Sequence, residues 1–222
     1  PEVDRERCTL CGRCAEVCAF NAIVVAGGNL LVFPELCHGC GSCTLNCPTE
    51  AIREVLHVTG TVERGGAGNV AFAQGTMNVG EPMAVPIIRQ LKKKHLTMSN
   101  QRTAILDAQP GTSCPVVETM RDADFVLMVT EPTPFGLHDL KLAVEAVKLL
   151  GIPRGLVINR SDIGNDDVRT YAKMENLPIL MEIPFDRRIA EVYSRGKLIV
   201  EEMPEWEERF RKLYLHIQEI VG

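Results

Sequence analysis

Two runs of cysteine decide the organisation of this chain: Cys8-Thr-Leu-Cys11-Gly-Arg-Cys14-Ala-Glu-Val-Cys18 and Cys37-His-Gly-Cys40-Gly-Ser-Cys43-Thr-Leu-Asn-Cys47. They hold eight of the nine cysteines, and the second run begins 29 residues after the first. The match extends beyond sulfur, because Gly12, Ala22 and Ile23 recur as Gly41, Ala51 and Ile52. This internal repeat predicts a unit with two-fold pseudo-symmetry.

The spacing within each run suits a cuboidal iron–sulfur cluster. Three thiolates can wrap one tight loop around a cluster, while the fourth, three residues further on, reaches the other cluster. Glycines at 12, 39 and 41 let the loop backbone approach closely. The spacing therefore predicts two 4Fe–4S clusters. We assign the first to Cys8, Cys11, Cys14 and Cys47, and the second to Cys37, Cys40, Cys43 and Cys18.

Other uses of the cysteines fit less well. Disulfides need an oxidising compartment, and no secretion signal is evident. Zinc ribbons use paired Cys-x2-Cys knuckles instead of a triple run with a fourth thiol. The stretch resembles the bacterial two-cluster ferredoxins, with one departure: Ala19 follows Cys18, where Pro48 follows Cys47. We expect this departure to weaken the turn of the first copy and not its ligation.

Composition limits the function classes. The 222 residues are 45% hydrophobic and 24% charged, which is ordinary for a globular protein with a real core. The net charge of −5 argues against a nucleic-acid partner, and the basic run Lys92-Lys93-Lys94 is too short and isolated to follow a phosphate backbone. No apolar run reaches the roughly 20 residues of a membrane span. We expect a cytoplasmic protein, since a reducing compartment suits such clusters.

The chain is expected to form two domains, a two-cluster unit at residues 1–60 and an α/β unit at residues 61–222. In the first, apolar runs at 22–25 and 30–33 flank Gly27-Gly28-Asn29 and predict a hairpin. Residues 60–81 are rich in glycine, and we interpret them as a loop or irregular hairpin. The run Gly65-Gly66-Ala67-Gly68 is not a phosphate loop, because no Gly-Lys-Ser/Thr follows.

After residue 82 short apolar strands alternate with amphipathic helices, which predicts a mostly parallel sheet covered by helices on both faces. Ligands of such sheets sit beyond the carboxyl ends of the strands. We expect strands at 103–107, 125–130, 156–159 and 179–182, and helices at 85–94, 137–150, 166–176, 186–195 and 206–220.

Three expected strand ends carry residues with chemistry. Asp107 closes an apolar run in the manner of a magnesium-binding carboxylate, although such an acid also caps helices. Asn159 can present its amide to a purine base or form an Asx turn. Pro184 follows the last strand, where its backbone can flank a base or simply turn the chain towards Asp186 as an N-cap.

Together these stretches resemble the C-terminal part of the MinD/Mrp-type P-loop ATPases, in the subgroup with an inserted two-cluster ferredoxin. Gly75–Ile88 is similar to the segment that re-enters the ATPase after such an insert. The other matching stretches are Ile105-Leu-Asp-Ala-Gln-Pro-Gly-Thr-Ser-Cys-Pro-Val116, Val129-Thr-Glu-Pro-Thr-Pro-Phe-Gly-Leu-His-Asp-Leu140, Val157-Ile-Asn-Arg160 and Ile183-Pro-Phe-Asp186.

The resemblance implies a P-loop NTPase-like fold that binds ATP and magnesium. Asp107 would be the switch acid near magnesium and Gly111 the switch pivot, while Asn159 would bind adenine beside Pro184. Gln109 stands where the subgroup usually has proline, which we expect to alter switch stiffness. Glu131, His138 and Asp139 also match, without a chemical role that we can give, and Cys114 is interpreted as a small buried residue.

Nothing in these 222 residues can serve as the family's phosphate loop, which lies upstream of the ferredoxin insert. The chain is therefore expected to be a piece of a longer protein or a short form, and to hydrolyse no ATP by itself.

Three functions follow from the sequence. The first is an iron–sulfur ATPase in which nucleotide state is coupled to electron transfer or to docking of a redox or client protein, with a possible homodimer. The second is a plain two-cluster electron carrier whose α/β part only docks a partner. The third is a scaffold that assembles iron–sulfur clusters or inserts metal.

Overall fold

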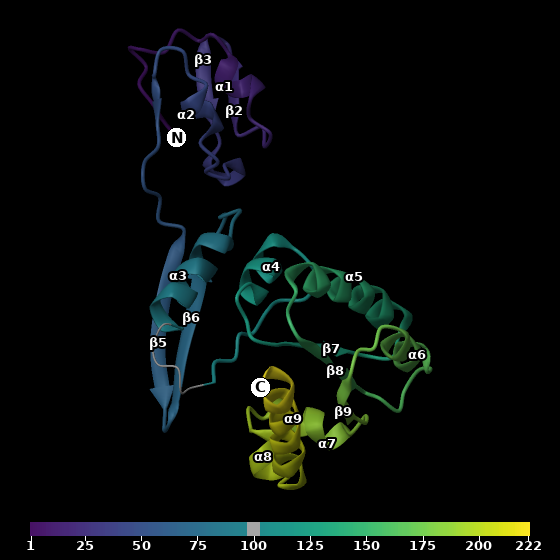
Figure 1. Ribbon diagram of the computed structural model, residues 1–222. Coiled ribbons are helices and arrows are strands. Elements are labelled where there is room, and N and C mark those ends of the chain that lie inside the picture. Colours follow the sequence, from purple (N-terminus) through teal and green to yellow (C-terminus); the bar gives the residue numbers. More distant parts are fainter. Residues whose placement is uncertain (97–102) are drawn as a thin grey trace. The chain divides into compact units, whose positions relative to one another are not determined.

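The computed structural model describes residues 1–96 and 103–222, and the chain divides into two compact units, Pro1–Ala104 and Ile105–Gly222 (Figure 1). We expected a boundary at residue 60, which instead lies inside the first unit. The first unit therefore contains more than the cysteine runs: a β-hairpin and a helix follow them.

The cysteine-rich part of the first unit is built from short elements. Strands β2 (Ile23–Ala26) and β3 (Asn29–Val32) form the expected antiparallel hairpin. Its turn residues Gly27 and Gly28 have φ angles of 57° and 73°, a left-handed conformation that glycine adopts without strain. A second pair, β1 (Glu2–Val3) with β4 (Ile52–Arg53), joins the two ends of this part, and the 3-10 turn η1 (Pro34–Leu36) precedes the second cysteine run.

The internal repeat is visible in the backbone. Helices α1 (Arg13–Glu16) and α2 (Ser42–Leu45) each begin after a left-handed glycine, Gly12 at φ 80° and Gly41 at φ 76°. The repeated apolar residues form the small core of this part, where Ile23 and Ile52 pack with Cys14. The two-fold repeat expected from the sequence thus determines which side chains are buried there.

Residues 60–77 form the hairpin β5 (Gly60–Ala67) and β6 (Val70–Met77), which agrees with the hairpin alternative for residues 60–81, although it is regular and not irregular. Its eight residue pairs run in regular antiparallel register. Helix α3 (Val85–His95) packs on one face, and a Cβ added to Gly75 would lie 2.3 Å from Cγ2 of Ile87. The glycines that suggested a loop are thus explained in part by the close approach of a helix to a regular sheet.

The second unit contains a parallel sheet in the order β7 (Val126–Thr130), β8 (Arg154–Asn159), β9 (Ile179–Ile183). The elements that connect these strands are α5 (Pro134–Leu150) and α6 (Asp167–Met174), and α4 (Cys114–Met120) precedes β7. After β9 the chain forms α7 (Arg187–Ser194), α8 (Ile199–Glu202) and α9 (Glu205–Val221). The α/β class with a parallel sheet is confirmed.

Helices cover both faces of this sheet. Side chains alternate along β8, so Leu156 and Ile158 pack with Val144 and Val147 of α5, in a cluster that also includes residues of α4 and α6. Val157 points the other way and packs with Trp206 of α9, in a cluster that includes residues of α7 and α8. Both clusters contain side chains with exposed fractions of 8% or less, which is why the strands are nearly continuous apolar runs.

Local sequence signals place the helix ends. Thr133 caps α5 by accepting a hydrogen bond from the Gly136 N–H at 3.0 Å, and Gly151 ends that helix at φ 68°. Asp186 caps α7 by accepting from the Arg188 N–H at 2.9 Å. The expected helices near 85–94, 137–150, 166–176, 186–195 and 206–220 are present with shifts of a few residues at their ends.

The buried strand expected at 103–107 is wrong. Residues 103–109 have no regular secondary structure, and Ile105 is 92% exposed. An isolated apolar run becomes a strand only when a neighbouring strand satisfies its backbone N–H and C=O groups. Among residues 1–96 and 103–222, no strand pairs with this segment.

We expect Gly75→Ala to weaken the packing of α3 on the β5–β6 hairpin by about 1–3 kcal/mol, the usual cost of overpacking. The added methyl group would meet the buried Ile87 side chain at 2.3 Å. Hydrogen–deuterium exchange should accelerate at the β5 and β6 amides. Gly65→Ala is the matched control, because a Cβ there meets nothing within 4 Å. Equal exchange in the two variants would contradict this account of the glycine.

Candidate functional site

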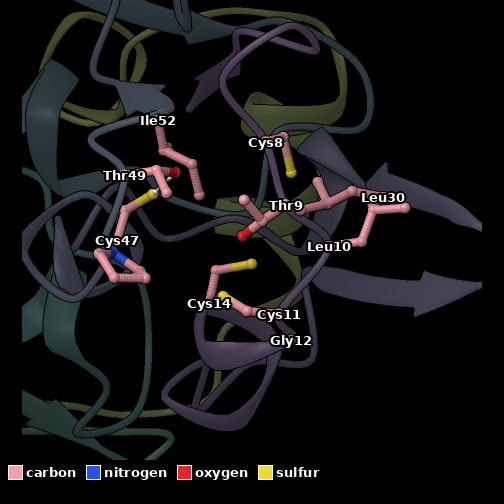
Figure 2. A pocket seen from close by; sticks show the side chains of 11 residues that line it. Cys8, Thr9, Leu10, Cys11, Gly12, Cys14, Leu30, Cys47, Thr49 and Ile52 are labelled. Atoms are coloured by element: carbon pink, nitrogen blue, oxygen red, sulfur yellow. Dashed lines mark hydrogen bonds between the residues drawn. The ribbon is translucent and has the colours of Figure 1, made fainter.

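A small pocket in the cysteine-rich part brings together cysteines of both runs. Figure 2 shows the sulfurs of Cys8 and Cys14 turned toward a common space, with Cys47 bordering it from another side. The pocket therefore contains three cysteines of the first run and the last cysteine of the second, the grouping that the spacing predicts for one cluster. The lining residues are Cys8, Thr9, Leu10, Cys11, Gly12, Cys14, Leu30, Cys47, Pro48, Thr49 and Ile52.

The donor set and the backbone around the pocket fit an iron–sulfur cluster. Four thiols border one space with apolar walls formed by Leu30 and Ile52, and thiolates are the ligands that such clusters use. The loop takes left-handed turns at Leu10, with φ 56°, and at Gly12, with φ 80°. Leu10 corresponds in the repeat to Gly39, with φ 61°, so the same loop geometry is built once without glycine.

Hydrogen bonds and burial act differently on the thiols. Cys47 Sγ accepts from the Ala51 N–H at 3.2 Å and contacts Thr49 Oγ1 at 3.8 Å. Burial opposes ionisation there, but the hydrogen bonds outweigh it and lower the pKa of Cys47. Burial raises the pKa of Cys14, and a hydrogen bond between Cys40 and the Ser42 hydroxyl lowers the pKa of Cys40. The thiolate, which is the ligating form, is thus favoured at Cys47 and Cys40.

The other four cysteines lie at the equivalent positions of the repeat. The Ala22 N–H donates to Cys18 Sγ at 3.3 Å, as the Ala51 N–H does to Cys47. The Gly39 N–H donates to Cys37 Sγ at 3.4 Å, and Cys40 Sγ lies 3.5 Å from Ser42 Oγ. No described contact joins Cys18 directly to the other three thiols.

The turns after the two fourth cysteines have the same shape, although Ala19 replaces proline in the first. The Asn21 N–H donates to the Cys18 carbonyl at 3.3 Å, and the Glu50 N–H donates to the Cys47 carbonyl at 3.2 Å. Asn21 and Glu50 are both left-handed, with φ angles of 52° and 49°. The missing proline therefore leaves the turn geometry intact, and the weaker turn that we expect from Ala19 stays a prediction.

A second group of polar residues gathers at the carboxyl ends of the parallel strands. Asn159, at the end of β8, donates through Nδ2 to Glu131 Oε1 at 3.3 Å, and Glu131 follows β7. Arg160 Nε lies 3.5 Å from the same carboxylate oxygen. The Arg160 guanidinium also lies 5.7 Å from the centre of the Phe185 ring, after β9. Sequence reasoning identified Asn159 but gave no role to Glu131 and missed Arg160 and Phe185.

Arg169 of α6 fixes the geometry of this edge. It donates from Nε and Nη2 to the two carboxylate oxygens of Glu182 at 3.0 and 2.8 Å, and from Nη2 to the Ser161 carbonyl at 2.7 Å. Hydrogen bonds to Glu182 and then to Asp166 raise the pKa of Arg169, and Arg169 lowers the pKa of Glu182. Since Glu182 lies in β9 and Ser161 follows β8, this side chain ties the two strand ends to a helix.

The remaining predicted nucleotide residues are less gathered. Pro184 is exposed beside Phe185, while Asp107 and Gly111 are exposed in a segment without helix or strand, with Gly111 at φ 97°. The described contacts do not join Asp107 or Gly111 to Asn159. His138 and Asp139 are exposed on α5. Cys114 is exposed at the start of α4, so the expectation that it is buried is wrong.

Comparison with known proteins supports the iron–sulfur site. Residues 7–52 match the 4Fe-4S dicluster domain family. An uncharacterized ferredoxin of Methanocaldococcus jannaschii is 41% identical over 54 residues, which are 22% of this chain and 70% of that protein. The chain thus belongs to the ferredoxin family through its cysteine repeat, and it is an iron–sulfur-binding, ferredoxin-like protein.

Two longer relatives come from the same organism. An uncharacterized protein is 33% identical over 181 residues, covering 82% of this chain and 62% of the relative. An uncharacterized ATP-binding protein is 30% identical over 149 residues, covering 65% of this chain and 52% of its own length. The chain therefore spans between about half and two thirds of these two relatives, and it has distant similarity to an ATP-binding protein.

Within residues 1–96 and 103–222, none of the helices combines the length and the apolar character needed to cross a membrane.

We expect Glu182→Gln to flatten the acid side of the stability profile of the second unit. The folded-state pKa of Glu182 lies below its ordinary value of 4.5. Its ion pair therefore stabilises the fold fully above the ordinary pKa, and this contribution is lost as pH falls through the folded-state pKa. Urea unfolding followed by the fluorescence of Trp206, the one tryptophan, between pH 7 and pH 3 measures the effect. Glu219→Gln, at an exposed position of α9, is the control. Parallel profiles for wild type and Glu182→Gln would contradict the assignment.

Proposed function

We propose that this protein transfers electrons through two 4Fe–4S clusters and that its second unit makes this transfer responsive to a nucleotide. The pocket that joins Cys47 to Cys8, Cys11 and Cys14 carries the proposal, because a ligand set taken from both runs is the pattern of two-cluster ferredoxins. Cys18, Cys37, Cys40 and Cys43 hold the second cluster. When bound, each cluster accepts and donates one electron.

The chain's own residues set the environment of the clusters. Backbone N–H groups of Ala51, Ala22 and Gly39 donate to cysteine sulfurs, and such hydrogen bonds stabilise negative charge on the cluster and raise its reduction potential. Hydroxyl groups of Ser42 and Thr49 act on Cys40 and Cys47 in the same direction. Cys11 and Cys40 are exposed, which provides a short path for electrons to a protein partner. A reducing cytoplasm suits such a site.

The nucleotide part of the proposal rests on three supports: the sequence resemblance to MinD/Mrp-type ATPases, the distant similarity to an ATP-binding protein, and the polar residues at the carboxyl ends of the sheet. Glu131 holds Nδ2 of Asn159, which orients the amide so that Oδ1 can accept a hydrogen bond from the exocyclic amine of adenine. In this proposal Pro184, which follows β9, would flank the base. Asp107 and Gly111 would complete the site near magnesium when the nucleotide orders their segment.

Coupling requires that the nucleotide bind two conformations of the protein with different affinity. The exposed segment around Asp107 and Gly111 is the candidate for the element that changes, because it has no helix or strand to hold it. A redox or client protein docked on the first unit, or a second copy of the chain, would sense the change. The proposal therefore concerns the native polypeptide in the presence of ATP, magnesium and a redox partner.

We expect removal of Cys47 to abolish the cluster held by the first run, so that Cys47→Ala keeps about half the iron of the wild type. The wild type should hold two clusters of four irons each. Cys18→Ala should also keep half, from the other cluster. Iron analysis and the absorbance of the anaerobically reconstituted protein measure both, and Cys114→Ala, outside the runs, should keep all the iron.

Double variants test the crossing of the ligands. Cys47→Ala with Cys14→Ala should lose no more iron than Cys47→Ala alone, because both side chains serve one cluster. Cys47→Ala with Cys43→Ala should lose nearly all of it. The reverse order of losses would mean that each run holds its own cluster and would overturn the assignment.

We expect Asn159→Ala to raise the dissociation constant of the native polypeptide for ATP about tenfold, the effect of losing one hydrogen bond of about 1.4 kcal/mol to the base. Titration calorimetry with magnesium and ATP measures it. Asn165→Ala is the matched control, because this exposed asparagine lies before α6 and donates a hydrogen bond to Asp167 at the start of that helix. Unchanged affinity in Asn159→Ala, or no binding to wild type, would remove the nucleotide part of the proposal and leave the iron–sulfur part standing.

A further inference from the structure

The two halves of the cysteine repeat differ at the residues that border the cluster sites. Thr9 and Thr49 line the first pocket. Shifted by the 29-residue period of the repeat, Thr9 corresponds to His38, and Thr49 corresponds to Phe20. Two small hydroxyl side chains on the first site are thus replaced on the second by two flat rings.

These two rings are in direct contact. Phe20 and His38 stack with their centroids 3.7 Å apart and their planes 4° from parallel. Phe20 lies two residues after Cys18, and His38 lies one residue after Cys37. The stack therefore joins the end of the first run to the start of the second, across the place where Cys18 must meet the loop of Cys37, Cys40 and Cys43.

The fourth cysteine of the second site has less local support than its counterpart. Cys47 receives the Ala51 N–H and also contacts the hydroxyl of Thr49. Cys18 receives the equivalent N–H of Ala22, but the position equivalent to Thr49 is Phe20, which has no hydroxyl to offer. The first set of cysteines also contains a buried member, Cys14, whereas all four of the second set are intermediate or exposed.

We propose that the Phe20–His38 stack is a clasp that positions Cys18 against the loop of the second run and covers the second cluster against water. Stacked rings contribute both apolar cover and a specific contact, which compensates for the missing hydroxyl and for the absence of a buried cysteine. Both sets have hydrogen bonds to their sulfurs, and the two clusters then differ in what else retains them: the buried Cys14 and the Thr49 contact at the first, and a surface ring pair at the second. This inference rests on the proposed ligation of both clusters.

The test is the rate at which iron leaves the reconstituted protein in an excess of the Fe²⁺ chelator bathophenanthroline disulfonate under reducing, anaerobic conditions. In Phe20→Ala, half of the iron should leave about tenfold faster than the corresponding half in wild type, since an aromatic contact of about 1.4 kcal/mol changes a rate tenfold. The other half should leave at the wild-type rate. The total cluster absorbance should fall in step with the release of iron.

Matched variants separate a clasp from a general loss of stability. Phe33→Ala removes another phenylalanine of the same part. Phe33 is 40% exposed, against 38% for Phe20, but Phe33 has no described ring contact. This variant should release iron as the wild type does. His38→Phe keeps a flat ring beside Phe20 without an imidazole, and it should also behave as the wild type, whereas His38→Ala should behave as Phe20→Ala.

Two results would overturn the clasp. One is equal release from Phe20→Ala and Phe33→Ala, and the other is acceleration of both halves of the iron in Phe20→Ala. If wild type takes up only one cluster or none, the proposed ligation itself fails, and this result is visible before any variant is compared. Combining Phe20→Ala with Cys18→Ala should leave only the slowly released half, which identifies the affected cluster.

Discussion

The proposed ligation places one constraint on the whole cysteine-rich part: each set of four thiols is assembled from both runs. The pocket shows this for Cys47, which borders the same space as Cys8, Cys11 and Cys14 although it lies in the other run. Under the proposed ligation, the two halves therefore cannot fold independently around their clusters. Three features of the backbone and core are compatible with such shared ligation. They are the paired turns after Cys18 and Cys47, the left-handed glycines before α1 and α2, and the small core of Ile23 and Ile52.

The second unit follows a different constraint, the burial of a parallel sheet on both faces. Alternation along β8 sends Leu156 and Ile158 into one apolar cluster and Val157 into the other. With both faces covered, polar chemistry is confined to the strand ends. There Arg169 binds Glu182 and the Ser161 carbonyl, while Glu131 holds Asn159. Because these side chains already hold each other in place, the Asn159 amide can bind a ligand at this edge of the sheet without a large loss of side-chain entropy.

The sequence predicted the parts of the fold that have local signals. Periodic apolar residues with caps located α5, α7 and α9, and the glycine turn located the β2–β3 hairpin. It failed where neighbours decide the outcome. The apolar run at 103–107 forms no strand because no described strand pairs with it. The glycines of 60–77 belong to a regular hairpin, in which Gly60 and Gly75 lie close to Ile87 of α3.

For the candidate site, spacing alone grouped the eight cysteines and pointed to Asn159, because ligand geometry and strand ends have a fixed relation to sequence. Only the tertiary structure decided what surrounds them: that Glu131 and Arg160 engage each other beside Asn159, that Cys114 is exposed, and that Phe20 stacks on His38. These contacts join residues that are far apart in the chain, or they depend on burial. Neither property can be predicted from the local spacing of residues. The sequence therefore predicted the ligands, and the tertiary structure determined the environment of these residues.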